Sequence, residues 1–297
     1  MTTTISWTDE VCNPIVGCSR ISEGCQKCYA ATAAKSARLQ QFPQYQKVAK
    51  WNGTVEFVKN QLEKPYKWKK PKKIFICSMA DIFHENVPFE WIEEIFYMIE
   101  NCPQHTFQIL TKRPERMIEF FDWYSARCSD HSVGLQWSIP DNVWLGVSCE
   151  NQAMADKRIP LLMEIPAKVR FLSCEPLLEP LDLSKFLPIE WSEIAEDWIE
   201  SWPGIGSYSR DTYPDWVIVG GESGTGAREC HVDWIRDIAS QCQSAKVPVF
   251  VKQLGSNALQ GDIANGSKLK LKDRKGSDIL EFPEDLKLQQ FPFPRTL

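Results

Sequence analysis

The chain has 297 residues, 43% of them hydrophobic, which is enough to bury a large core and argues against a disordered protein. A formal net charge of −5 argues against a protein whose whole surface grips nucleic acid, although a local basic patch stays open. The sequence has no run of about 18 apolar residues, and the first residues, MTTTISWTDE, lack the basic and apolar regions of a signal peptide. We therefore expect a soluble, cytoplasmic protein without a membrane segment.

The first feature along the chain is a group of three cysteines. Six residues separate Cys18 from Cys25 and two separate Cys25 from Cys28, so one loop can bring three thiolates to one metal centre. A short helix is expected directly afterwards, over residues 30–35. The other cysteines are scattered, and without an export signal a disulfide framework does not explain them.

Two kinds of metal centre fit this spacing. A 4Fe-4S cluster normally takes four thiolates, so three cysteines would leave one iron open to another molecule. With Cys12 as a fourth ligand, the same segment would form a closed zinc site. Zinc usually stabilises a small region that lacks a core, whereas this segment heads a large domain, so its position favours the cluster.

A lysine-rich segment follows, over residues 64–73, with six lysines around Tyr66 and Trp68. Basic charge with interleaved aromatic rings can bind a nucleic-acid backbone and stack on its bases. The alternative is a solvated loop at the amino-terminal rim of a barrel, away from the chemistry. The sequence alone favours the solvated loop.

The rest of the chain alternates between strand and helix patterns. Six short apolar runs, most of them without alternation, are typical of strands buried on both faces of a parallel sheet. They cover residues 74–77, 107–110, 143–147, 169–172, 216–219 and 249–251. The spacing i, i+3, i+4, i+7 predicts helices between them, at Ile92, Ile95, Phe96 and Ile99, and at Ile235, Ile238, Ala239 and Cys242.

This alternation predicts an α/β fold. We expect a partial or complete TIM-like parallel (β/α) barrel of about six to eight strands, occupying residues 1–255. An acidic, tryptophan-rich insertion is expected near residues 190–213, after the fifth strand. Residues 256–297 lose the repeat and are expected to form an appended C-terminal tail.

Polar residues follow each predicted strand, where the site of a parallel barrel is built. They are Ser78, Met79 and Asp81; Thr111, Lys112 and Arg113; Ser148, Glu150 and Asn151; Ser173 and Glu175; Gly220, Gly221 and Glu222; and Lys252 and Gln253. Glu150 and Glu175 are candidates for proton transfer, and Lys112 for binding an anion. The alternatives are a helix cap for Ser78 or Asp81, a solvated charge pair for Lys112 and Arg113, and a merely flexible turn for the glycines.

Several motifs together resemble a family of phage and prophage proteins of unknown function that carries a three-cysteine motif and is usually grouped with radical S-adenosylmethionine enzymes. The resemblance runs from Trp7 to about Gly255. The motifs are residues 7–9 (WTD), 13–14 (NP), the three cysteines with Tyr29, 78–85 (SMADIFHE), 104–116 (QHTFQILTKRPER), 142–148 (NVWLGVS), 173–177 (SCEPL) and 219–224 (VGGESG).

The resemblance implies a barrel of the radical S-adenosylmethionine type, with a 4Fe-4S cluster held by Cys18, Cys25 and Cys28. Tyr29 and the strand-end residues, chiefly Ser78, Met79 and Asp81, would bind S-adenosylmethionine. A flavodoxin or ferredoxin would donate electrons, and the phage association suggests a nucleotide or nucleic-acid base as substrate. The chain departs from the family in having Cys12 where tryptophan is usual, and from familiar radical enzymes in the six-residue first gap.

Two other functions stay open. The first is a zinc-stabilised barrel that acts as an interaction module and binds nucleic acid or protein. The second is a metal-dependent nuclease that uses Asp81, Glu150, Glu175 and Glu222, although no motif orders these acids.

Overall fold

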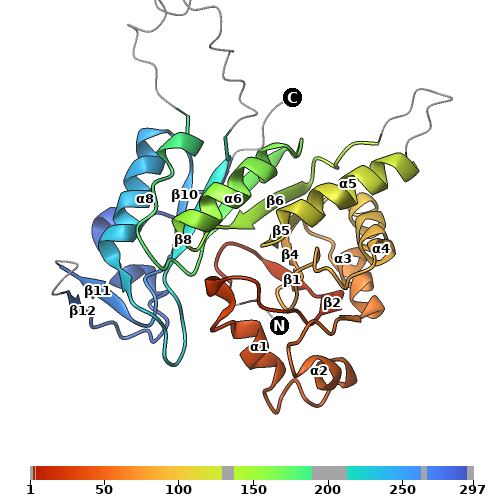
Figure 1. The fold of residues 1–297 in the computed structure, drawn as a ribbon, viewed down its shortest axis with the longest axis horizontal. Helices are drawn as coiled ribbons and strands as arrows, with labels where there is room; N and C mark the ends of the chain where they lie inside the picture. Colours follow the sequence, from red (N-terminus) through yellow and green to blue (C-terminus); the bar gives the residue numbers. More distant parts are fainter. Residues whose placement is uncertain (1–2, 4, 129–136, 189–212, 262–265, 293–297) are drawn as a thin grey trace, which may run out of the picture. The chain divides into compact units, whose positions relative to one another are not determined.

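The computed structural model describes residues 3, 5–128, 137–188, 213–261 and 266–292. The chain forms two compact units, Met1–Ser148 and Cys149–Leu297, each with strands and helices of its own (Figure 1). The expected acidic insertion near residues 190–213 lies, apart from its last residue, outside the described part.

The first unit is built on four parallel strands. Their order is β1 (Glu10–Cys12), β4 (Lys73–Ile76), β5 (Thr106–Thr111) and β6 (Val143–Ser148). The register pairs Cys12 with Ile76, Ile76 with Ile109 and Thr111 with Val147, so the carboxyl ends of neighbouring strands meet at one edge. The three predicted strands of this unit are confirmed. The sequence did not locate β1, because three residues are too short for a pattern.

Helices of the first unit surround this sheet. They are η1 (Glu23–Cys25), α1 (Tyr29–Ala34), α2 (Pro43–Val48), η2 (Lys59–Glu63), α3 (Lys64–Lys67), α4 (Phe89–Glu100) and α5 (Pro114–Cys128), with a small β2–β3 pair (Ile15–Val16 and Glu56–Phe57) beside them. The predicted helices at residues 30–35 and around Ile92–Ile99 are confirmed. Pro114 begins α5, a position where its missing N–H costs no hydrogen bond.

An aromatic cluster packs between α4 and α5. Phe96 of α4 lies 5.2 Å from Phe120 of α5, ring centre to ring centre, and 5.9 Å from Tyr124. Phe83, from the loop after β4, lies 6.0 Å from Phe120. All four rings are buried. Large buried rings contribute much of a core's apolar area, so this cluster fixes the β4 loop against the helices.

The second unit has three parallel strands, in the order β7 (Val169–Cys174), β8 (Trp216–Gly220) and β10 (Val249–Gln253). Its helices are α6 (Gln152–Met163) and α8 (Val232–Ser244), with the 3₁₀ turns η3 (Ser184–Phe186), η6 (Ile279–Glu281) and η7 (Glu284–Leu286). All three strands and the helix around Ile235–Cys242 were predicted and are confirmed.

The residues after Gly255 pack onto the second unit. Strand β11 (Ala258–Gln260) pairs with β9 (Cys230–His231) and with β12 (Ser267–Lys268). Further along, the N–H of Val251 donates to Leu288 O at 2.8 Å, and the indole N–H of Trp216 donates to Gln290 O at 2.8 Å. Residues 256–292, expected as a tail, therefore complete the sheet edge and core of this unit within the described ranges.

Each unit thus alternates parallel strands with helices. The chain has a mixed α/β fold whose strands are consistent with a partial (β/α) barrel. Within the described residues, no helix has both the length and the apolar character needed to cross a bilayer.

Candidate functional site

The cysteine loop, residues 18–28, begins beside the end of β4. The N–H of Gly17 donates to Met79 O at 3.0 Å, and Gly17 forms a parallel bridge with Ala80. Gly17 has a φ of +95°, and a Cβ at this position would lie 2.2 Å from Thr54 O. Only glycine fits such a backbone without displacing its neighbours. The chain therefore delivers Cys18 to the carboxyl ends of the strands, as the barrel prediction requires.

The three thiols share one neighbourhood. Cys18, Cys25 and Cys28 are all partly exposed, whereas seven of the other eight cysteines are buried. Cys18 and Cys28 pack against one hydrophobic cluster, to which Met79 also belongs. Cys25 ends η1, with its sulfur 3.8 Å from the hydroxyl of Ser22. In the described chain, no three His, Cys, Asp or Glu side chains already stand together as in a formed metal site.

The thiol of Cys18 has a raised pKa. Burial, and then the charge of the Asp81 carboxylate, raise this pKa to about 12, against the opposite influence of the Arg113 guanidinium. The thiol is therefore protonated at neutral pH in the metal-free protein. Because metals bind thiolates, metal binding at Cys18 must release this proton.

Cys12 lies apart from this loop chemistry. Its side chain is fully buried in β1, and its thiol donates to Gln61 O at 3.3 Å. Burial raises its pKa to about 12. A sulfur engaged with a backbone carbonyl in the core is poorly suited to complete a zinc site with the loop.

Asp81 organises the loop that follows β4. Its Oδ1 accepts from the Thr111 hydroxyl at 2.7 Å and from the N–H of Phe83 at 3.0 Å. Its Oδ2 accepts from the N–H of Lys112 at 3.0 Å and from Arg113 at 3.1 Å. The helix start that the sequence offered as an alternative is absent, since residues 78–88 form turns. Both carboxylate oxygens join the ends of β4 and β5, so Asp81 acts as a turn residue.

Arg113 links the strand ends to the cysteine loop. Its side chain is 9% exposed and binds Asp81 at 3.1 Å and Glu85 at 2.8 Å. The same guanidinium donates to the hydroxyl of Ser19 at 3.0 Å and lies 3.7 Å from the sulfur of Cys18. One planar cation with several donors can hold acceptors from several segments in fixed geometry. Arg113 therefore fixes the start of the cysteine loop.

Ser19 and His84 complete this network. The N–H of Asn86 donates to Nδ1 of His84 at 3.0 Å, so the proton of the neutral ring lies on Nε2. Nε2 is 2.8 Å from the Ser19 hydroxyl, which in turn donates to Glu85 at 3.2 Å. Burial, and then the charge of Arg113, lowers the pKa of His84. The ring therefore stays neutral and donates to Ser19.

The other predicted residues of the first unit lie around this centre. The Tyr29 hydroxyl donates to Ser78 O at 2.6 Å, and the Ser78 hydroxyl donates to Asn13 at 3.1 Å. Met79 is 7% exposed. Lys112 is half-buried between Thr111 and Arg113, and Ser148 is buried at the end of β6. Tyr29, Ser78, Met79, Asp81, Thr111 and Lys112 thus share the surroundings of the loop.

Two predicted residues of the second unit lie at the start of α6. Glu150 is fully buried and binds Arg158 at 2.8 Å. Asn151 precedes α6, and its side chain accepts from the N–H of Met154 at 3.0 Å, which is a helix cap. Glu150 has an oppositely charged partner in the core, and its predicted catalytic role stays a prediction.

Glu175 forms a second ion pair in this unit. Its carboxylate lies 3.0 Å from the ammonium of Lys252, at the end of β10, and 3.5 Å from the Ser173 hydroxyl. A Cβ on Gly220 would lie 2.8 Å from the same carboxylate. The glycine therefore lets Glu175 and Lys252 meet at the ends of β7, β8 and β10.

The glycine-rich turn after β8 contains a third ion pair. Glu222 is 7% exposed, and Arg228 binds both of its oxygens, at 2.5 Å and 3.0 Å. Gln253 donates to Gly221 O at 2.6 Å and holds the turn against β10. Hydrogen bonds therefore hold the turn at Gly221 and Glu222.

The structure therefore brings several predicted residues of the first unit together around the cysteine loop, whereas Glu150, Glu175 and Glu222 of the second unit each pair with a different cation. Sequence reasoning missed the partners that hold them, which are Asn13, Ser19, Glu85, Arg158 and Arg228. Two of these residues could have been found from the sequence, because Ser19 follows Cys18 and Glu85 belongs to the SMADIFHE motif. Arg158 lies eight residues after Glu150, about two helix turns along the chain, and carries no such signal.

Comparison with known proteins gives one result. A family model described as "Protein of unknown function (DUF5131)" matches residues 2–283. Searches of curated proteins and of solved structures gave no significant match.

Proposed function

Because the chain belongs to the family of proteins of unknown function DUF5131, its activity has to be inferred from its residues, and we propose that it is a radical S-adenosylmethionine enzyme. Cys18, Cys25 and Cys28 would hold a 4Fe-4S cluster. The observation that carries the proposal is the cysteine loop itself, three partly exposed thiols at the carboxyl ends of parallel strands.

The donor set fits such a cluster. Thiolates are the usual ligands of iron-sulfur clusters, and three of them leave one coordination position for another molecule. Cys12, the candidate fourth ligand, has its thiol on a backbone carbonyl. Such a cluster would supply the one-electron reduction that splits the C5′–S bond of S-adenosylmethionine into methionine and a 5′-deoxyadenosyl radical, and that radical would take a hydrogen atom from the substrate.

The chain's own residues would position the reactants. Arg113 and the Ser19–His84–Glu85 network hold the loop at the strand ends. The Tyr29 hydroxyl fixes the turn at Ser78, and buried Met79 provides an apolar wall next to Cys18 and Cys28.

A metal and product analysis tests the proposal. Protein purified and reconstituted without oxygen should contain iron and sulfide, and after one-electron reduction by flavodoxin or ferredoxin it should convert S-adenosylmethionine into 5′-deoxyadenosine and methionine. Alanine at any one of Cys18, Cys25 or Cys28 should remove both the cluster absorption and the product. Cys12→Ala is the matched control, because Cys12 is bound elsewhere, and it should keep both.

Three results would contradict the proposal. Stoichiometric zinc without iron, in protein that cannot be reconstituted with a cluster, would indicate the zinc-stabilised interaction module. Loss of the metal in the Cys12→Ala protein would show that the ligand count is wrong. DNA cleavage by cluster-free protein that depends on divalent ions would favour the nuclease.

A further inference from the structure

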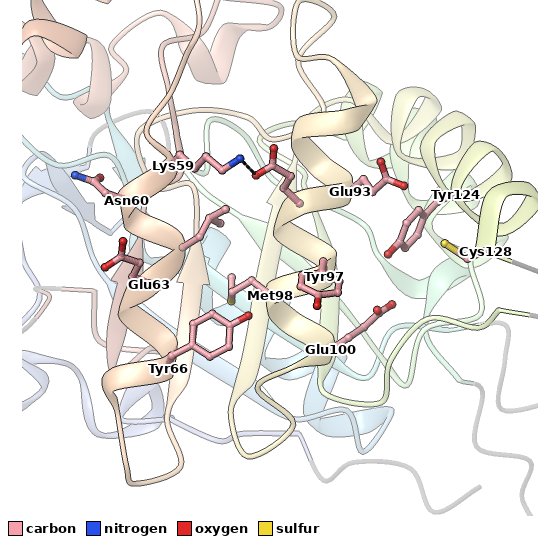
Figure 2. A pocket seen from close by; sticks show the side chains of 12 residues that line it. Lys59, Asn60, Glu63, Tyr66, Glu93, Tyr97, Met98, Glu100, Tyr124 and Cys128 are labelled. Carbon is pink, nitrogen blue, oxygen red and sulfur yellow. Dashed lines mark ion pairs between the residues drawn. The ribbon is translucent and has the colours of Figure 1, made fainter.

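A surface groove in the first unit lies outside the site described above. It has a volume of about 790 Å³, and η2, α3, α4 and α5 line it. Tyr66 of α3 and Tyr97 of α4 lie on either side of Met98 (Figure 2). The two tyrosines are 51% and 65% exposed. Exposed aromatic rings flanking an apolar floor are suited to stacking against flat ligands.

The lysine-rich segment adjoins this groove through Tyr66, which belongs to both. Lys64, Lys67, Lys69 and Lys70 are exposed. Only Lys67 among these four has a described ion pair, with Glu63 at 3.0 Å, and both members of that pair are well exposed. Exposed pairs of this kind contribute little free energy, so the lysines stay available to other anions.

The segment is also held in place, unlike a solvated loop. Pro65 is buried, and its carbonyl lies 3.0 Å from Nε2 of His105. The ring of Trp68 meets His105 edge-on at 6.1 Å, and the ammonium of Lys72 lies 5.7 Å above Trp68. These contacts fix the backbone of α3 while its lysines face solvent.

Three of the groove's four acids have a cationic partner and the fourth accepts a hydrogen bond, which reduces but does not remove their repulsion of a polyanion. Glu94 binds Lys59 at 2.7 Å (Figure 2), and Glu93 binds Arg127 at 3.1 Å. Glu100 accepts from the indole N–H of Trp137 at 2.8 Å. The remaining acid, Glu63, is the partner of Lys67.

We propose that this groove and the lysine segment form a binding surface for single-stranded nucleic acid. The lysines would contact phosphates, and Tyr66 and Tyr97 would stack on bases, the two contributions that sequence-independent binding of single strands combines. An acidic peptide would pair with the lysines, but it would not provide flat rings to stack on the two tyrosines. The inference does not rest on the proposed metal chemistry, since the segment precedes β4 whereas the cysteine loop contacts the residues after it.

Fluorescence anisotropy of the full-length chain with labelled single strands of about 12 nucleotides, DNA and RNA in separate arms, tests this surface. Replacing Lys64, Lys67, Lys69 and Lys70 by glutamine should raise Kd at least tenfold at about 50 mM salt and lower the salt slope by about 0.7 for each lysine that contacts a phosphate. Tyr66→Ala or Tyr97→Ala should each raise Kd about fivefold or more, and Tyr66→Phe should keep the wild-type Kd.

The matched control replaces four exposed lysines of another segment, Lys268, Lys270, Lys272 and Lys275, by glutamine. This variant has the same net charge as the first one and should bind within about twofold of wild type. Circular dichroism checks that each variant is folded. The proposal fails if wild type does not bind, if the control loses as much affinity, or if polyglutamate or duplex DNA competes as well as the single strand. None of these results bears on the cluster.

Discussion

The two units differ in the environment of their cysteines and acids. In the first unit, three partly exposed cysteines lie on a loop. A hydrogen bond from Arg113 to Ser19 holds the start of this loop. In the second unit, the conspicuous acids Glu150, Glu175 and Glu222 each have an oppositely charged partner within 3 Å. The first unit therefore presents cysteines, which the proposed cluster would use, and the second presents acids that are paired with cations.

The largest effect is expected where an ion pair is completely buried. Arg158→Met should lower the free energy of unfolding by about 3 to 5 kcal/mol, because it leaves the Glu150 carboxylate uncompensated in the core. Urea denaturation followed by circular dichroism measures this change. The double variant Glu150→Gln, Arg158→Met should recover part of the loss. If Arg158→Met lowered the free energy of unfolding by less than about 1 kcal/mol, the pair would contribute no more than an exposed ion pair does. The two units would then not differ in this respect.

A smaller and more local effect is expected at Arg113. Arg113→Met removes the guanidinium from Asp81, Glu85 and Ser19, but water can replace it at Glu85, whose side chain is 55% exposed. Asp81 keeps three other donors, so the fold should persist while the loop loosens.

Hydrogen exchange measures this loosening. Amides of residues 18–28 should exchange faster in Arg113→Met, and those of α8 should not change. Arg127→Met is the control, because the described contacts of Arg127 are with Glu93 at 3.1 Å and with the ring of Trp123 at 5.0 Å, away from the cysteine loop. Unchanged protection of the cysteine loop in Arg113→Met would show that Arg113 does not hold it.

The smallest effect concerns pH. The pKa of His84 is lowered in the folded protein, whereas the unfolded chain has an ordinary histidine pKa of about 6.5. The unfolded state therefore binds more protons below that value. The contribution of His84 is fully present above pH of about 6.5 and is lost as the pH falls through its folded pKa.

Unfolding measured between pH 7.5 and pH 5 should show this loss in wild type and less of it in His84→Gln, which cannot titrate. If the free energy of unfolding changed equally with pH in both proteins, groups other than His84 would cause the pH dependence. His84 would then not contribute to a pH dependence of the first unit.

Much of the fold was predictable because its signals are local. The run 74–77 lacks polar alternation since both faces of β4 are covered, and the spacing of Ile92, Ile95, Phe96 and Ile99 follows from the helical period. Strand β1 was missed because three residues carry no period, and the packing of residues 256–292 was missed because Trp216 and Val251 contact them over long sequence separations.

The spacing of the three cysteines, the helix after them and the polar residues at strand ends could all be read from the chain, since each depends on near neighbours in the sequence. Which groups share a partner depends instead on packing. It turned Cys12 toward Gln61 O and joined Asp81, Glu85 and Ser19 through Arg113. Hydrogen bonds and burial act over a few ångströms in space, and residues this far apart in sequence meet only when the strands between them have packed.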